Sequence, residues 1–193
     1  MARQLNYVAL AAGILSLILI AVSVFVPWWV FTVGDPAIAT VNFSPVNFNF
    51  SLFDTLLVVP LIWALNLACL LILLAGGVAL LIYATSPTKP YAKPLLRFGY
   101  RKPLYAVLLF TAELAVLYFA AAVLTGAGFP LAGSSAMQLP TELAPGDISV
   151  SVTVSAAFGW TFYFAIAVAS LCIAARVYHK KAVAQPAGTG LAA

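Results

Sequence analysis

Four long apolar stretches limit what this chain can fold into. A helix needs about 20 apolar residues to cross the hydrocarbon core of a bilayer, and residues 7–26, 56–84, 104–124 and 158–177 each meet that length. The chain is 64% hydrophobic and 7% charged, whereas about a quarter of the residues in a soluble domain are charged. The sequence therefore predicts an integral membrane protein, an all-α bundle of four spanning helices.

The charged residues divide between the two sides of these stretches. All nine Lys and Arg residues lie before the first stretch, between the second and third, or at and after the end of the fourth. Acids occupy the other two connections, as Asp35, Asp54, Glu142 and Asp147. Because basic segments stay inside, we expect a plasma-membrane protein with both termini in the cytoplasm. We expect residues 1–181 to form one four-span domain, and 182–193 a flexible cytoplasmic tail.

Two segments of the outer loops alternate apolar and small polar residues. They are residues 41–51, in the loop at 30–53, and residues 148–155, in the loop at 125–157. This period of two is typical of strands, and Pro45 marks a turn or an edge. We expect the loops to share one small extracytoplasmic antiparallel sheet, because a lone two-stranded ribbon is marginal in water. Two unrelated extended loops are the alternative. The face expected to pack on aromatic side chains carries Ile148, Val150, Val152 and Val154.

Two short motifs resemble the claudins and the peripheral myelin protein group. Pro27-Trp28-Trp29 follows the first stretch, and Phe53-Asp54-Thr55-Leu56-Leu57-Val58-Val59-Pro60 opens the second. The resemblance implies a claudin-like fold, with four spans, inner termini and an outer sheet, and a role in adhesion or lateral assembly. The longer first loop of the claudins, with its Gly-Leu-Trp and cysteine pair, is not matched, so barrier formation is not implied. The second motif also has an explanation that needs no relationship to the claudins: Asp54 can cap a helix start, and Pro60 can occupy the first turn of that helix.

Aromatic residues at the outer helix ends predict an interfacial belt. Trp28, Trp29 and Trp160 stand at such ends, and with Asp54 they form the expected outer interface.

Glu113 is the sharpest candidate for a functional residue. It lies about nine residues into the third stretch, hence about 14 Å deep, where a carboxylate should face the bundle or a wet cavity. Asn66 in the second stretch is the expected partner, because a carboxamide can donate to and accept from a carboxyl group. The pair is either a proton or cation site, or a neutral clamp between helices or to a partner subunit.

Small residues and basic residues define two further surfaces. Gly76-Gly77, with Ala75 and Ala79, allows close helix approach within the bundle or in an oligomer. Between the second and third stretches, prolines prevent a long helix, and the basic residues suit anionic lipid headgroups. These residues are Lys89, Lys93, Arg97, Arg101 and Lys102.

The sequence carries little that indicates catalysis. His179 is the single histidine, Cys69 and Cys172 lie within spans, and no nucleotide-binding, metal-binding or hydrolase motif occurs. We expect no enzyme activity, metal, cofactor or nucleic-acid partner, and we expect contact with membrane lipid. A tetraspan scaffold for lateral assembly or adhesion, as a homo-oligomer or with a partner membrane protein, is the favoured function. The alternatives are an accessory subunit of a respiratory or transport complex, and an oligomeric channel that uses Glu113.

Overall fold

The computed structural model describes residues 5–58, 60–125, 128–138 and 151–184. Four of its helical segments are long and apolar enough to cross a membrane, which confirms the four predicted spans. The helices are α1 Tyr7–Phe25, α2 Pro60–Thr85, α3 Ala92–Gly99, α4 Arg101–Thr125 and α5 Trp160–Ala184. The third spanning segment, Ala92–Val123, combines the short α3 with most of α4.

Local sequence explains where several helices begin and end. The Asn6 side chain caps α1 by accepting a hydrogen bond from the Ala9 amide at 3.0 Å, as N-cap residues do. Pro60 is the first residue of α2, a position where a missing N–H costs little. Pro103 offers no N–H to the Gly99 carbonyl one turn earlier, and this accounts for the break between α3 and α4.

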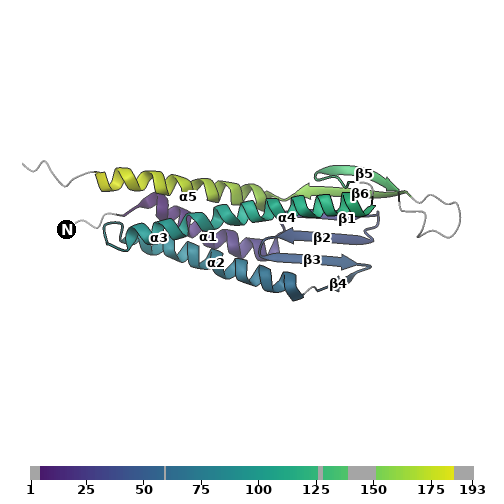
Figure 1. Cartoon of the computed structure of the whole chain (residues 1–193), viewed down its shortest axis with the longest axis horizontal. Coiled ribbons are helices and arrows are strands. Elements are labelled where there is room, and N and C mark those ends of the chain that lie inside the picture. Colours follow the sequence, from purple (N-terminus) through teal and green to yellow (C-terminus); the bar gives the residue numbers. More distant parts are fainter. Residues whose placement is uncertain (1–4, 59, 126–127, 139–150, 185–193) are drawn as a thin grey trace, which may run out of the picture.

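The helices form one bundle with an uneven seam. α1 packs extensively against both α2 and α5, and α4 packs mainly against α5. The contact between α2 and α4 is less extensive than those of α1 with α2 and with α5. Figure 1 shows α2 running away from the other helices toward its sheet end.

An antiparallel six-stranded sheet stands at one end of the bundle, as predicted (Figure 1). Its order is β4-β3-β2-β1-β6-β5. The strands are β1 Trp29–Val33, β2 Ala39–Ser44, β3 Asn47–Leu52, β4 Thr55–Leu57, β5 Gly133–Gln138 and β6 Ser151–Phe158. Because β1 pairs with β6, with Trp29 opposite Phe158, both loops contribute to the same sheet.

The centre of the sheet is continuous with two neighbouring helices. β1 follows α1 after a short connection, and β6 runs into α5 through Gly159. The Gly159 amide donates to the Trp28 carbonyl at 2.8 Å, and the Thr161 hydroxyl donates to the Pro27 carbonyl at 2.7 Å. A Cβ at Gly159 would lie 2.6 Å from the same Pro27 oxygen. The sheet is thus fixed to the bundle at this crossing of two backbones.

Alternation in β6 places its apolar side chains toward the protein. Val154 and Ala156 are buried, whereas Ser151, Thr153 and Ser155 are exposed. The predicted apolar face is therefore present from Val152 onward, while Ile148 and Val150 lie outside the described residues. Pro45 falls in the turn between β2 and β3, as expected.

The predicted start of the second span was wrong. Residues 55–57 form β4, which pairs with β3 through Leu52 opposite Thr55, and the helix begins at Pro60. A short apolar run such as Leu56-Leu57 is compatible with either strand or helix, and pairing with β3 selects the strand. Likewise Phe158, the expected start of the fourth span, belongs to β6. The third spanning segment begins at Ala92, well before the predicted residue 104, because it includes α3. The remaining span limits differ by a few residues.

The predicted role of Asp54 as a helix cap was also wrong. Phe53 and Asp54 have φ values of 47° and 59° and form the two-residue connection between β3 and β4. Two consecutive residues with positive φ form a hairpin turn whose twist matches the right-handed twist of the flanking strands. Asp adopts positive φ more readily than most residues. The motif that resembles a claudin helix entry is therefore a hairpin turn and an edge strand here.

Trp28 and Trp29 do not belong to an interfacial belt. Their exposed fractions are 0% and 2%, whereas Trp160 is 59% exposed. The Trp28 ring packs against Phe110 at 5.2 Å between centroids, and its indole N–H donates to the Ser23 hydroxyl at 2.8 Å. The indole N–H of Trp29 donates to the Leu131 carbonyl at 2.9 Å. Both side chains fill the junction between the sheet and the helices.

Candidate functional site: the outer part of α2 and the basic end

The first half of α2 is held loosely by the rest of the protein. All of its buried residues come from the second half, and they are Leu73, Gly76, Gly77, Ala79, Leu80, Tyr83 and Ala84. The first half instead exposes large apolar side chains, among them Leu61 at 71% and Trp63 at 63%. Lipid can cover such a helix face within the bilayer. Within this half, Cys69 and Leu70 are partly buried against the core of the protein.

The exposed apolar surface continues beyond the helix onto the sheet. β4 is the edge strand next to β3, and the residues in and around it are exposed. We name these residues and the start of α2 the α2–β4 surface: Phe53, Leu56, Leu57, Val58, Leu61 and Trp63. An edge strand with apolar side chains is a template for pairing with another chain. This surface is the strongest candidate for a protein interface in the described chain.

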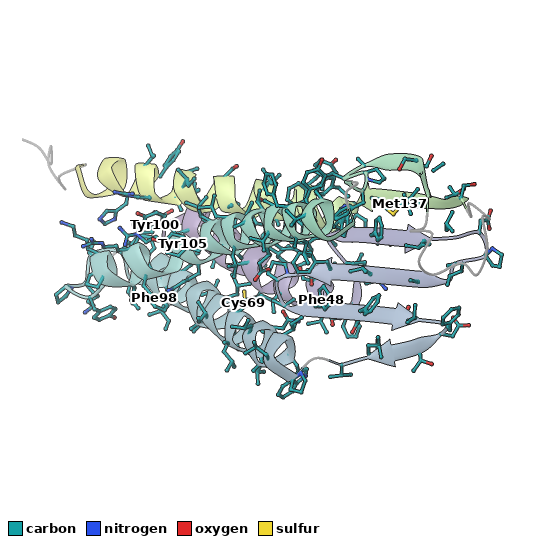
Figure 2. The ribbon with its side chains drawn as sticks, turned by 45° about the vertical axis from the view of Figure 1, so that its right-hand side comes forward. Phe48, Cys69, Phe98, Tyr100, Tyr105 and Met137 are labelled. Atoms are coloured by element: carbon teal, nitrogen blue, oxygen red, sulfur yellow. The ribbon has the colours of Figure 1, made fainter. Side chains whose placement is uncertain are left out.

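Two open cavities flank the first half of α2. One of about 470 Å³ lies between α2, β3 and the end of α1, and is lined by Val24, Asn47 and Trp63 among others. The second, of about 330 Å³, lies between α2, α4 and the β2–β3 hairpin. Phe48, Ile62 and Asn66 line both. Figure 2 shows Phe48 at the foot of the sheet and Cys69 on α2 near it.

The smaller cavity brings together the two polar residues predicted as an intramembrane pair. Glu113 and Asn66 both line it, and the other lining side chains are apolar, such as Phe43 and Val116. Among the described residues, no hydrogen bond joins Glu113 to Asn66. The Cys69 thiol, about one helical turn after Asn66 on α2, lies close enough to Glu113 for a charge on the carboxyl group to act on it. A carboxyl and a carboxamide in an apolar cavity can hold a polar group of another segment, but offer no chain of groups for relaying protons.

The small residues of α2 serve the bundle. A Cβ on Gly77 would lie 2.8 Å from Cδ2 of Leu17 on α1, and one on Gly76 would lie 2.7 Å from Cβ of Lys102 on α4. Ala79 is buried, and Ala75 is exposed. Of the two predicted uses of this region, close packing inside the protein is thus the one these glycines have.

The predicted headgroup residues gather at the opposite end from the sheet, which we call the basic end. There α3 is amphipathic, with Ala92 and Leu96 buried and Lys93 and Arg97 exposed. The Lys102 ammonium lies 4.4 Å from the centroid of the Phe98 ring. Figure 2 shows Phe98, Tyr100 and Tyr105 together at this end. Lys89, in the connection between α2 and α3, is exposed.

Sequence reasoning missed the centre of this basic end. The buried Tyr100 hydroxyl accepts hydrogen bonds from Arg101 Nε at 3.2 Å and from Arg176 Nη1 at 2.5 Å. Arg176 belongs to α5, 76 residues away along the chain. Adjacency of Tyr100 and Arg101 was visible in the sequence, but the approach of Arg176 depends on how α5 packs.

A second polar cluster at this end was also missed. The fully buried Tyr83 accepts from Asn6 Nδ2 at 3.1 Å, and its hydroxyl lies 2.7 Å from Nδ1 of His179. These contacts join α1, α2 and α5. The single histidine of the chain therefore takes part in a structural hydrogen bond between helices. Within the described ranges, no three His, Cys, Asp or Glu side chains gather as a metal site would require.

Comparison with known proteins identifies no family for this chain. A scan against protein-family models found no match, and neither did a search of curated proteins. The described architecture defines a four-span membrane protein with a six-stranded sheet, and the claudin resemblance remains a prediction.

Proposed function

We propose that this chain is a non-enzymatic, claudin-like four-span scaffold of the plasma membrane that assembles side by side with further copies through the α2–β4 surface. The sheet lies outside the cell and the basic end lies in the cytoplasm. The observation that carries the proposal is the exposed apolar edge strand β4, which continues into the exposed first half of α2.

Lipid alone is a poor explanation for this surface. Exposed leucines along α2 are ordinary for a helix in a bilayer, but β4 precedes the helix and belongs to the sheet. Contiguous apolar side chains on such an element mark sites of protein association. The two cavities beside α2 leave it room to adjust when a neighbour packs against it.

The topology of the sheet favours a neighbour in the same membrane. Six alternating antiparallel strands leave the edges β4 and β5 running in opposite directions. In a second copy with the same membrane orientation, β5 would therefore run antiparallel to β4 of the first. Such head-to-tail contacts generate rings or open rows of subunits. Two copies of β4 related by an axis along the membrane normal would instead run parallel.

Native mass spectrometry after gentle detergent extraction tests the proposal. We expect a ladder of multiples of the 20.3 kDa chain. Leu56→Lys places a charge on the edge strand and should reduce the ladder to monomer, because edge lysines oppose strand pairing. Ile38→Lys makes the same change at 40% exposure in the turn between β1 and β2, and should leave the ladder intact.

Three results would contradict self-assembly through this surface. One is a monomeric parent protein, and another is a ladder unaffected by Leu56→Lys. The third is a foreign chain bound at fixed stoichiometry, which would identify an accessory subunit of a larger complex.

A further inference from the structure

Two guanidinium groups converge on one phenol oxygen at the basic end. Arg101 is the first residue of α4 and Arg176 lies on α5, and both donate to the Tyr100 hydroxyl. The guanidinium carbons of Arg176 and Arg101 lie 4.8 Å and 5.7 Å from the centroid of the Tyr100 ring. Arg97, near the end of α3, also lies within electrostatic range of the same residue.

This arrangement is held in place by the fold. Tyr100 is only 6% exposed, and its amide donates to the Leu96 carbonyl at 3.1 Å across the junction of α3 and α4. The phenol oxygen is therefore a fixed point, and each guanidinium is oriented by a hydrogen bond and by the face of an aromatic ring. Arg176 itself is exposed, so the cluster is accessible from outside.

Among the described residues, no carboxylate is paired with the guanidinium groups of the cluster. No Asp or Glu occurs between Asp54 and Glu113 or after Asp147. In the described part of the chain, Asp35 lies in the β1–β2 turn, Asp54 in the β3–β4 turn, and Glu113 lines the α2–α4 cavity. The positive charges of the two guanidinium groups repel each other, and an anion bound between them would offset this repulsion.

Phosphate is the anion that fits these groups best. Each guanidinium uses one N–H on Tyr100 and keeps several others as donors in a planar fork. That fork matches two oxygens of a phosphate or carboxylate, and Arg pairs with phosphate in this bidentate manner. The basic end of a spanning bundle lies at the depth of the lipid headgroups, where phosphate groups are abundant.

We propose that Arg101 and Arg176, oriented by Tyr100, bind the phosphate group of an anionic membrane lipid or free phosphate. This goes beyond diffuse attraction of the basic end to the membrane, because it assigns the binding to two named side chains. It is independent of the proposed assembly, since the α2–β4 surface lies at the other end of α2.

Lipid titration of the full chain in detergent tests the site. Phosphatidylglycerol is added to one sample and phosphatidylcholine to another, and bound lipid is counted by native mass spectrometry. We expect a preference for phosphatidylglycerol in the parent protein. Arg101→Gln and Arg176→Gln should each weaken its binding by about tenfold or more, as expected for a lost hydrogen bond to a charged group. Lys89→Gln removes the same charge from a predicted headgroup residue outside the pair and so measures the diffuse attraction of the basic end. Because an exposed charge is screened by salt, it should weaken binding by less than about twofold.

A conservative variant separates geometry from charge and from folding. Arg176→Lys keeps the positive charge but lacks the planar fork, and we expect affinity between those of the parent and Arg176→Gln. Thermal unfolding of each variant without lipid identifies any loss that comes from misfolding. If Arg176→Gln is unfolded, the lipid affinity of Arg176→Lys relative to the parent tests the site instead.

Inorganic phosphate distinguishes the two sources of the ligand. If phosphate displaces phosphatidylglycerol at constant ionic strength, the site accepts free phosphate; if it does not, the bilayer supplies the ligand. Either result supports the site. Equal loss of binding in Arg176→Gln and Lys89→Gln would overturn it, as would equal binding of the two lipids by the parent or parent-like binding by Arg176→Lys.

Discussion

Glu113 is an acid in the middle of a spanning helix, and its surroundings limit what it can do. It lines an apolar cavity with Asn66, and no Lys or Arg occurs between Lys102 and Arg176. An ion-conducting site would normally gather several polar groups along a path. One carboxyl beside one carboxamide is better suited to a local contact between α2, α4 and a neighbouring segment.

We expect Glu113→Gln to be nearly silent. An amide has the shape of a protonated carboxyl and can make the same kinds of hydrogen bond, so the free energy of unfolding should change by less than about 1 kcal/mol. Proton and cation flux into vesicles that contain the parent or the variant should equal the flux into protein-free vesicles. A flux that the parent supports and Glu113→Gln abolishes would favour the channel over the scaffold.

Single residues were the hardest part of the molecule to place from sequence. Trp28 follows a spanning helix, as a belt residue would, yet it is fully buried and packs against Phe110 and Phe162. Asp54 precedes an apolar run, as a cap would, yet it lies in a left-handed turn. Glu113 and Asn66 line the same cavity, and their pairing by a hydrogen bond stays a prediction. Tyr100 and Arg176 could not be paired without the packing of α5.

At the scale of elements, the contact between α1 and α2 depends on two glycines, because a residue without a side chain lets the helices approach closely. A Cβ on Gly13 would lie 2.7 Å from Leu81 Cδ2 and 3.2 Å from the Gly77 carbonyl oxygen. In the same way, a Cβ on Gly77 of α2 would lie 2.8 Å from Leu17 Cδ2 on α1. The two backbones therefore approach closely at this pair of glycines, as small residues allow in membrane helices. This seam holds the second half of α2, which contains all of the buried residues of that helix.

Gly77→Leu should loosen the seam. Overpacking a well-packed site costs about 1–3 kcal/mol, and Leu17 and the Gly13 backbone leave little space for a larger side chain. Ala75→Leu is the matched control, because Ala75 is exposed on the same helix and should change stability by less than about 0.5 kcal/mol. Unfolding in mixed micelles followed by circular dichroism gives both values. Equal stability of the two variants would mean that the α1–α2 contact is not tight.

The elements themselves could be predicted to different extents. The spanning helices follow from apolar length, and strands β2, β3 and β6 follow from alternation in two loops. Strands β1 and β5 lie outside the alternating segments and were not predicted. The division of residues 56–84 into β4 and α2 was missed, because the apolar pattern does not change where the strand ends. Only the pairing of β4 with β3 distinguishes the two, and that pairing is a tertiary contact.

At the scale of the whole molecule, the chain has two chemically different ends. The α1–β1 and β6–α5 connections lead from helices directly into the sheet (Figure 1). The basic end, remote from the sheet, carries Lys89, Lys93, Arg97, Arg101 and Arg176. The sheet end holds Asp35 and Asp54. Because positive segments resist translocation, this polarity predicts one orientation in the membrane.

Thiol labelling in cells that express the full chain tests that orientation. Asp54→Cys lies in the β3–β4 turn and Lys89→Cys lies between α2 and α3, and both positions are exposed. A membrane-impermeant maleimide should label Asp54→Cys in intact cells and Lys89→Cys only after permeabilisation. The parent is the control, because Cys172 is buried, Cys69 is half-buried and both lie in spanning helices. The reverse labelling pattern would place the sheet in the cytoplasm. The edge strand β4 would then serve a cytoplasmic partner, and the guanidinium pair would face the outer leaflet.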